Sequence, residues 1–107
     1  MTVEREIKKL ELENGRVPFD EWFIALRDSR LQAAVDARLA RVRAGNFGDH
    51  KSVGGGVSEL RIHASPGLRV YYGQVGGAIV VLLGGGSKSA QARDIARAKK
   101  LWAEFNK

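Results

Sequence analysis

The stretch that decides the fold runs from Glu59 to Gly73 and reads ELRIHASPGLRVYYG. The adjacent proline and glycine in its middle predict a turn, so the stretch should form two short strands joined as a hairpin. Alternate residues of a strand point to opposite faces of its sheet. One face of the hairpin is therefore apolar and should lie on the core, and its residues are Leu60, Ile62, Val70 and Tyr72.

The opposite face of the hairpin collects polar side chains: Glu59, Arg61, His63, Arg69 and Tyr71. A sheet face that merely meets solvent usually mixes threonine, serine, lysine and glutamate. Two arginines with a histidine and a tyrosine instead favour an anion-binding site, because guanidinium groups bind phosphate and carboxylate strongly. From the hairpin alone, an ordinary polar outer face is an equally good interpretation.

Length and composition narrow the class of protein. The 107 residues predict one domain, 1–107, and 44% hydrophobic residues with 28% charged residues are typical of a globular protein. No cysteine is present, which excludes a disulfide framework and a thiolate metal site. No segment approaches the roughly 20 apolar residues that cross a bilayer, so we expect a cytoplasmic protein without a membrane partner.

The positive charge is unevenly distributed, and this suggests an anionic partner. The net charge is +6, but residues 1–28 contain five Lys/Arg against seven Asp/Glu. The remaining residues contain thirteen Lys/Arg against five Asp/Glu, so they form a basic body. Nucleic acid is the first candidate for the partner, and an acidic protein would respond to the same field.

The rest of the chain predicts an α+β protein. Pro18 suits the first position of a helix, and Asp28 can cap a second helix that Gly45 ends. Gly76–Gly77 predicts a tight turn before a strand buried on both faces, and the three glycines at 84–86 predict a flexible entry to the last helix. The expected strands are 3–12, at the sheet edge, 51–53, the two of the hairpin and 78–83, and the expected helices are 18–28, 29–44 and 89–105.

Candidate chemistry rests on positive charge rather than on a metal. The two histidines lack the companions that a zinc site needs, and the Gly84–Ser89 segment lacks the glycine spacing of a phosphate-binding P-loop, so we expect neither metal nor cofactor. Basic groups on a sheet can hold a phosphate and stabilise its transition state without a metal. Two classes stay open, a metal-independent ribonuclease and a non-catalytic anion-binding module. The residues concerned are Lys51, Arg61, Arg69, Tyr71 and Lys88, with His63 or Lys51 as acid or base.

The helix 29–44 is also strongly basic. Arg38, Arg41 and Arg43 lie on it, and they form either a solvated face or a contact for nucleic acid or a partner protein.

Five motifs, in this order, resemble the RelE/ParE superfamily of toxins, and most closely its HigB-like branch of addiction module killer proteins. They are PFxxWxxxL at 18–26, GNxGDxK at 45–51, GVxELRI at 56–62, PGLRVYY at 66–72 and KxxQxxDIxxA at 88–98. The resemblance covers nearly the whole chain. It implies a β-α-α-β-β-β-α layout, with an antiparallel meander packed against an N-terminal αα-hairpin and followed by a C-terminal helix.

The resemblance also implies a function. It implies a type II toxin that is neutralised by a helix-turn-helix antitoxin and that cleaves mRNA on the ribosome through attack of the RNA 2′-hydroxyl. Arg61 and Arg69 would clamp the phosphate, Lys51 and Lys88 would add positive potential, and Tyr71 would stack on a base or orient the nucleophile. The implied RNA-binding residues are Arg38, Arg41, Arg43, His63 and Gln91. The ParE branch implies an alternative, inhibition of DNA gyrase without nuclease activity.

Overall fold

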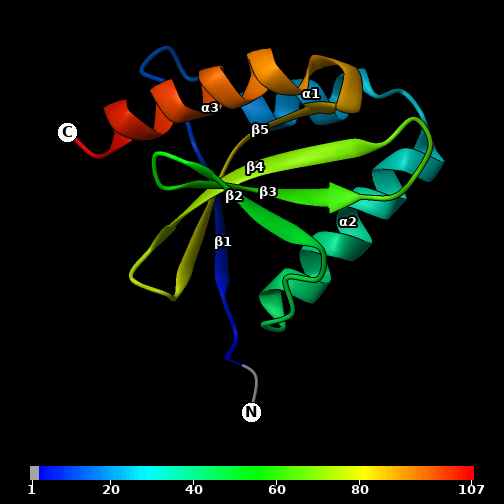
Figure 1. Cartoon of the computed structure of the whole chain (residues 1–107), viewed down its shortest axis with the longest axis horizontal. Helices are drawn as coiled ribbons and strands as arrows, with labels where there is room; N and C mark the ends of the chain where they lie inside the picture. The colour runs from blue at the N-terminus through cyan, green and yellow to red at the C-terminus, as the bar shows by residue number, and fades with distance from the viewer. Residues whose placement is uncertain (1–2) are drawn as a thin grey trace.

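The computed structural model describes residues 3–107 and shows an α+β protein (Figure 1). One five-stranded sheet has the order β1-β5-β4-β3-β2. The strands are β1 (Glu6–Lys9), β2 (His50–Gly54), β3 (Val57–Ile62), β4 (Leu68–Val75) and β5 (Ile79–Ser87). The helices are α1 (Pro18–Ala25), α2 (Ser29–Arg43) and α3 (Gln91–Phe105), with a short 3₁₀ turn η1 (Lys88–Ala90) before α3. In the described part of the chain, no helix is long and apolar enough to cross a membrane.

The sheet is mixed, and this corrects the expected strand layout. Strands β2 to β5 form an antiparallel meander, so four strands follow the first two helices, as the residues predicted and one more than in the layout that the resemblance implied. Strand β1 lies at the sheet edge, as expected, but pairs parallel to β5, with Glu6 opposite Ile79. Parallel neighbours need a long crossover. Here the crossover consists of all the elements between β1 and β5, from α1 to β4.

Helix boundaries agree with the local signals. Asp28 caps α2, since its carboxylate accepts hydrogen bonds from the backbone N–H groups of Arg30 (2.9 Å) and Leu31 (3.3 Å). Pro18 is the first residue of α1, where its missing N–H costs nothing. Helix α1 ends at Ala25, a few residues earlier than predicted.

The apolar face of the hairpin lies in the core, as predicted. Leu60, Ile62, Val70 and Tyr72 are buried and cluster with Val35 and other residues of α1 and α2. The hairpin register places Arg61 opposite Arg69 and Glu59 opposite Tyr71. Burial of each large apolar side chain contributes about 1.5–3 kcal/mol, so this face supplies much of the stability of the fold.

The second face of the sheet is also covered, which the polar pattern of the hairpin did not predict. Tyr71 packs there with Val57, Leu83 and the α3 residues Ala98 and Trp102. Gly73 makes this possible, because a Cβ at that position would lie 2.6 Å from the indole of Trp102. In Figure 1, α3 and α2 lie on different sides of the strands.

The glycines at 84–86 are not a flexible entry to the last helix, and that prediction was wrong. They belong to β5, which continues to Ser87. A Cβ at Gly85 would collide with the ring of Trp22, and one at Gly86 would collide with the carboxylate of Asp94. The segment is glycine-rich because α1 and α3 approach the strand from its two sides.

Candidate functional site

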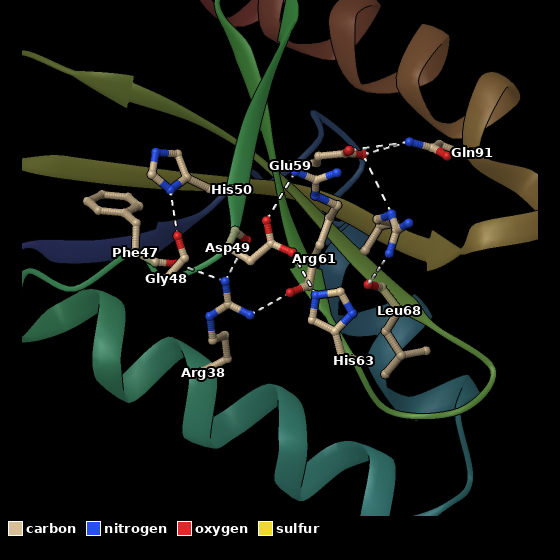
Figure 2. A network of polar contacts seen from close by, with 11 residues as sticks. Arg38, Phe47, Gly48, Asp49, His50, Glu59, Arg61, His63, Leu68 and Gln91 are labelled. Atoms are coloured by element: carbon tan, nitrogen blue, oxygen red, sulfur yellow. Dashed lines mark hydrogen bonds and ion pairs between the residues drawn. The ribbon is translucent and has the colours of Figure 1, made fainter.

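An exposed cluster of one carboxylate, one imidazole and one guanidinium lies where β3 ends and β2 begins (Figure 2). His63 Nε2 lies 2.6 Å from Asp49 Oδ2, and Arg61 Nη2 lies 3.1 Å from Asp49 Oδ1. The two strands hold the cluster in register, because the backbone N–H of Arg61 donates to the carbonyl of Asp49 at 3.0 Å. We name these three residues the Asp49 cluster.

Arg38, on α2, holds the backbone around the Asp49 cluster in place through hydrogen bonds. Its guanidinium is buried and donates to the carbonyl oxygens of Arg61 (2.6 Å), Phe47 (2.8 Å) and Asp49 (2.6 Å), as Figure 2 shows. Burial lowers the pKa of Arg38 from its usual value. The structure therefore does not support the expected RNA contact of Arg38. Its side chain instead positions the loop that presents Asp49.

The pKa of the Asp49 carboxyl is lowered, first because His63 hydrogen-bonds to it and further because of the positive charge of Arg61. A lowered pKa in the folded state means that the interaction stabilises the fold above the unfolded pKa near 4. This contribution is lost as the pH falls through the folded pKa of Asp49.

We expect the substitutions His63→Ala and Arg61→Ala each to raise the pKa of Asp49 toward its ordinary value of 3.8. A ¹³C NMR titration of the Asp49 carboxyl measures this. Lys51→Ala is the control, since Lys51 is exposed on β2 and makes no ion pair with Asp49. An unchanged Asp49 pKa in both cluster variants would contradict the arrangement.

A second polar cluster is buried beneath the start of α3. Glu59 is 1% exposed and Arg69 is 9% exposed. Gln91 Nε2 donates to both carboxylate oxygens of Glu59 (3.3 and 3.0 Å), and Arg69 Nε lies 3.8 Å from Glu59 Oε2. Arg69 also donates to the carbonyl of Leu68 at 3.3 Å. Glu59 therefore pairs with Arg69 and Gln91.

This burial bears on three of the expected site residues. Arg61 and Arg69 do face each other across the hairpin, but Arg69 is covered and paired, so the two do not form an open phosphate clamp. Gln91 points at Glu59 (Figure 2), which does not support an RNA contact. Tyr71 is 1% exposed, so its ring cannot stack on a base at the surface.

The remaining expected residues are exposed but not gathered into one site. Lys51 lies on β2 opposite Glu59. Lys88 begins η1, and its backbone N–H donates to Gly67 in the hairpin turn. Arg41 and Arg43 lie in the last turn of α2.

Sequence reasoning missed Asp49 as a site residue. Its position directly before a strand, within the GNxGDxK motif, was the available signal, but its partners are 12 and 14 residues further along the chain. Among residues 3–107, no group of three His, Cys, Asp or Glu side chains could hold a metal ion. What the Asp49 cluster offers is an oriented imidazole beside a fixed positive charge, which suits acid–base chemistry on an anion.

Fold and site together define a small basic α+β protein with an exposed Asp–His–Arg cluster on a mixed sheet. The chain belongs to the same family as a protein of Haemophilus influenzae described as uncharacterized. The two are 48% identical over 87 residues, which cover 81% of this chain and 88% of the relative. No model of a known protein family matches the chain. No solved structure matches it either.

Proposed function

We propose that this chain is a RelE/ParE-type toxin of the HigB-like branch, which acts in the cytoplasm and cleaves mRNA without a metal ion. The observation that carries the proposal is the Asp49 cluster, an imidazole and a guanidinium held side by side on one exposed carboxylate. The ordered motifs of the sequence support the family assignment. The strand order and the α3 covering are compatible with it.

The geometry of the Asp49 cluster suits cleavage by the RNA's own 2′-hydroxyl. A carboxylate only accepts hydrogen bonds, so Asp49 selects the His63 tautomer that carries its proton on Nε2. The other ring nitrogen, Nδ1, is then free of a proton and can accept the one from the 2′-hydroxyl. The O2′–P bond forms as the P–O5′ bond breaks, and water protonates the leaving oxygen.

Arg61 is the group that stabilises charge on the phosphate. Its side chain is about one-third exposed (33%) and already oriented by Asp49. A preorganised donor costs little rearrangement when negative charge develops on the phosphate oxygens. Lys51 and Lys88 supply further positive potential, and the net charge of +6 favours binding to an RNA backbone.

We propose a helix-turn-helix antitoxin as the partner that neutralises this protein and the translating ribosome as the place where it meets mRNA. Expression of the chain alone should then stop protein synthesis before DNA synthesis. Pulse labelling of both processes after induction measures this order. If DNA synthesis stops first while mRNA stays intact, the protein is a gyrase inhibitor of the ParE type instead.

A further inference from the structure

A cleft outside the Asp49 cluster lies between α1 and α3, along the C-terminal half of β5. Figure 1 shows α1 and α3 next to each other near the end of this strand. The volume of the cleft is about 510 Å³, within the range of sites that bind small molecules. The walls are mostly apolar, and they include Trp22, Leu26, Leu83 and Ala98. The floor is the glycine run of β5, so no side chain of that strand segment fills the cleft.

One polar group in this cleft lacks a partner. Tyr71 lines the cleft, and its hydroxyl is buried without a hydrogen bond to any residue in the described part of the chain. Leaving a buried polar group unpaired costs about 1–3 kcal/mol, so such a group in a native protein calls for an explanation. Burial, with the negative charges of Glu59 and Asp94 nearby, raises the pKa of Tyr71 to about 12. The hydroxyl therefore keeps its proton and is available as a donor.

An acceptor and two cations complete the cleft. The carboxylate of Asp94 is largely buried and also lines it, and Asp94 lies near enough to Tyr71 to influence its titration. Arg93 and Arg97 are exposed at its mouth, and Arg93 Nε lies 3.6 Å from Asp94 Oδ1, so Asp94 is already paired on one side and, within residues 3–107, Arg97 is the unpaired cation. The acidic residue on the α1 side, Glu21, is already neutralised by two hydrogen bonds from Arg16 (2.7 and 3.0 Å).

We propose that this cleft binds a nucleobase that carries an exocyclic amine next to a ring nitrogen, as adenine and cytosine do. The apolar walls hold the ring, Tyr71 donates to the ring nitrogen, and Asp94 accepts from the amine. Arg93 and Arg97 contact the attached phosphate. The base can come from a free mononucleotide or from single-stranded RNA. The proposal does not depend on whether the chain cleaves RNA.

The test is an NMR titration of the intact, isotope-labelled protein with AMP, and with IMP and ribose 5-phosphate as matched probes. IMP replaces the amine with a carbonyl, and ribose 5-phosphate lacks the base. We expect AMP to shift the indole N–H signal of Trp22 and to bind about tenfold more tightly than IMP, the ratio expected for 1.4 kcal/mol. Short oligoadenylate and oligouridylate strands show whether RNA is the source of the base, with the adenylate strand preferred.

Two variants and a control locate the binding. Tyr71→Phe removes the unpaired hydroxyl and should weaken AMP binding about tenfold, the effect of roughly one hydrogen bond. Ala90→Leu places a side chain in the cleft and should abolish the shift at Trp22. Ala92→Leu is the control, because Ala92 is exposed nearby but does not line the cleft.

Three results would overturn the proposal. Equal affinity for AMP, IMP and ribose 5-phosphate would show that only the arginines bind, through the phosphate. An AMP shift that persists in Ala90→Leu would place the ligand elsewhere. A site with a Kd of about 1 mM would be nearly saturated at about 10 mM nucleotide. The absence of any shift at Trp22 at that concentration would show that the cleft does not bind nucleobases.

Discussion

Arg61→Ala should slow cleavage of mRNA by about 10²–10³-fold, the usual cost of removing one preorganised charge contact from a transition state. His63→Ala should slow it by a similar factor, because a general base contributes about 10²–10⁴-fold. Single-turnover cleavage of labelled mRNA on translating ribosomes measures both rates. Arg61→Lys should recover little, since lysine cannot form the paired hydrogen bonds of a guanidinium.

The control for these variants is Arg43→Ala, which removes an exposed charge from the far end of α2. It should leave the cleavage rate nearly unchanged. Arg61 and His63 lie in exposed ion pairs, which contribute about 0–1 kcal/mol to stability, so their removal should barely change the melting temperature. If Arg61→Ala and His63→Ala both cleave as fast as the original chain, the Asp49 cluster has no part in the reaction.

Trp102→Ala should lower the free energy of unfolding by about 3–5 kcal/mol, the typical cost of truncating a buried aromatic side chain. Trp102 is 8% exposed and packs against the glycines of β4 and the loop before β3. No neighbouring side chain replaces it, because Gly73 and Gly56 have none. Urea denaturation of the purified protein measures the loss.

Phe105→Ala is the matched control on the same helix. The Phe105 ring stacks on Trp102 with centroids 5.2 Å apart, but it is 46% exposed. Its truncation should cost much less than that of Trp102. An equal loss in the two variants, or none for Trp102, would show that α3 is not held to the sheet by Trp102.

Local signals in the sequence predicted a large part of the fold. The Asp28 cap, the turn at Pro66–Gly67 and the apolar face of the hairpin each depend on neighbours within a few residues. Alternation along the hairpin also predicted that Arg61 and Arg69 share a face, and the strand register confirms it. Such features are decided by backbone geometry and strand periodicity alone.

Features that depend on distant partners could not be predicted. The parallel pairing of β1 with β5 joins residues more than 70 positions apart, and no local pattern encodes it. The three consecutive glycines of β5 predict a flexible segment. The structure shows that Trp22 and Asp94 pack against them, and neither contact can be read from the local sequence. Glu59 and Arg69 are buried because α3 packs over them. The polar pattern of the hairpin gives no sign of this packing.

The same limit applies to the candidate site. Arg38 resembles a surface arginine in the sequence, yet it is buried and donates to two carbonyl groups of the loop that follows its helix and to one carbonyl group of β3. In the sequence, Asp49 is an ordinary turn residue. Its role follows only from its contacts with Arg61 and His63 in the folded protein. Polar residues acquire these roles only through tertiary contacts.

The central claim is that this chain cleaves mRNA through the RNA 2′-hydroxyl. Analysis of the RNA ends, after purified protein is added to translating ribosomes, tests it most directly. The account predicts new 3′ ends with a 2′,3′-cyclic phosphate and new 5′ ends with a hydroxyl, and both should form about 10²–10³-fold more slowly with Arg61→Ala. Intact mRNA, or new 5′ ends that carry a phosphate, would contradict it.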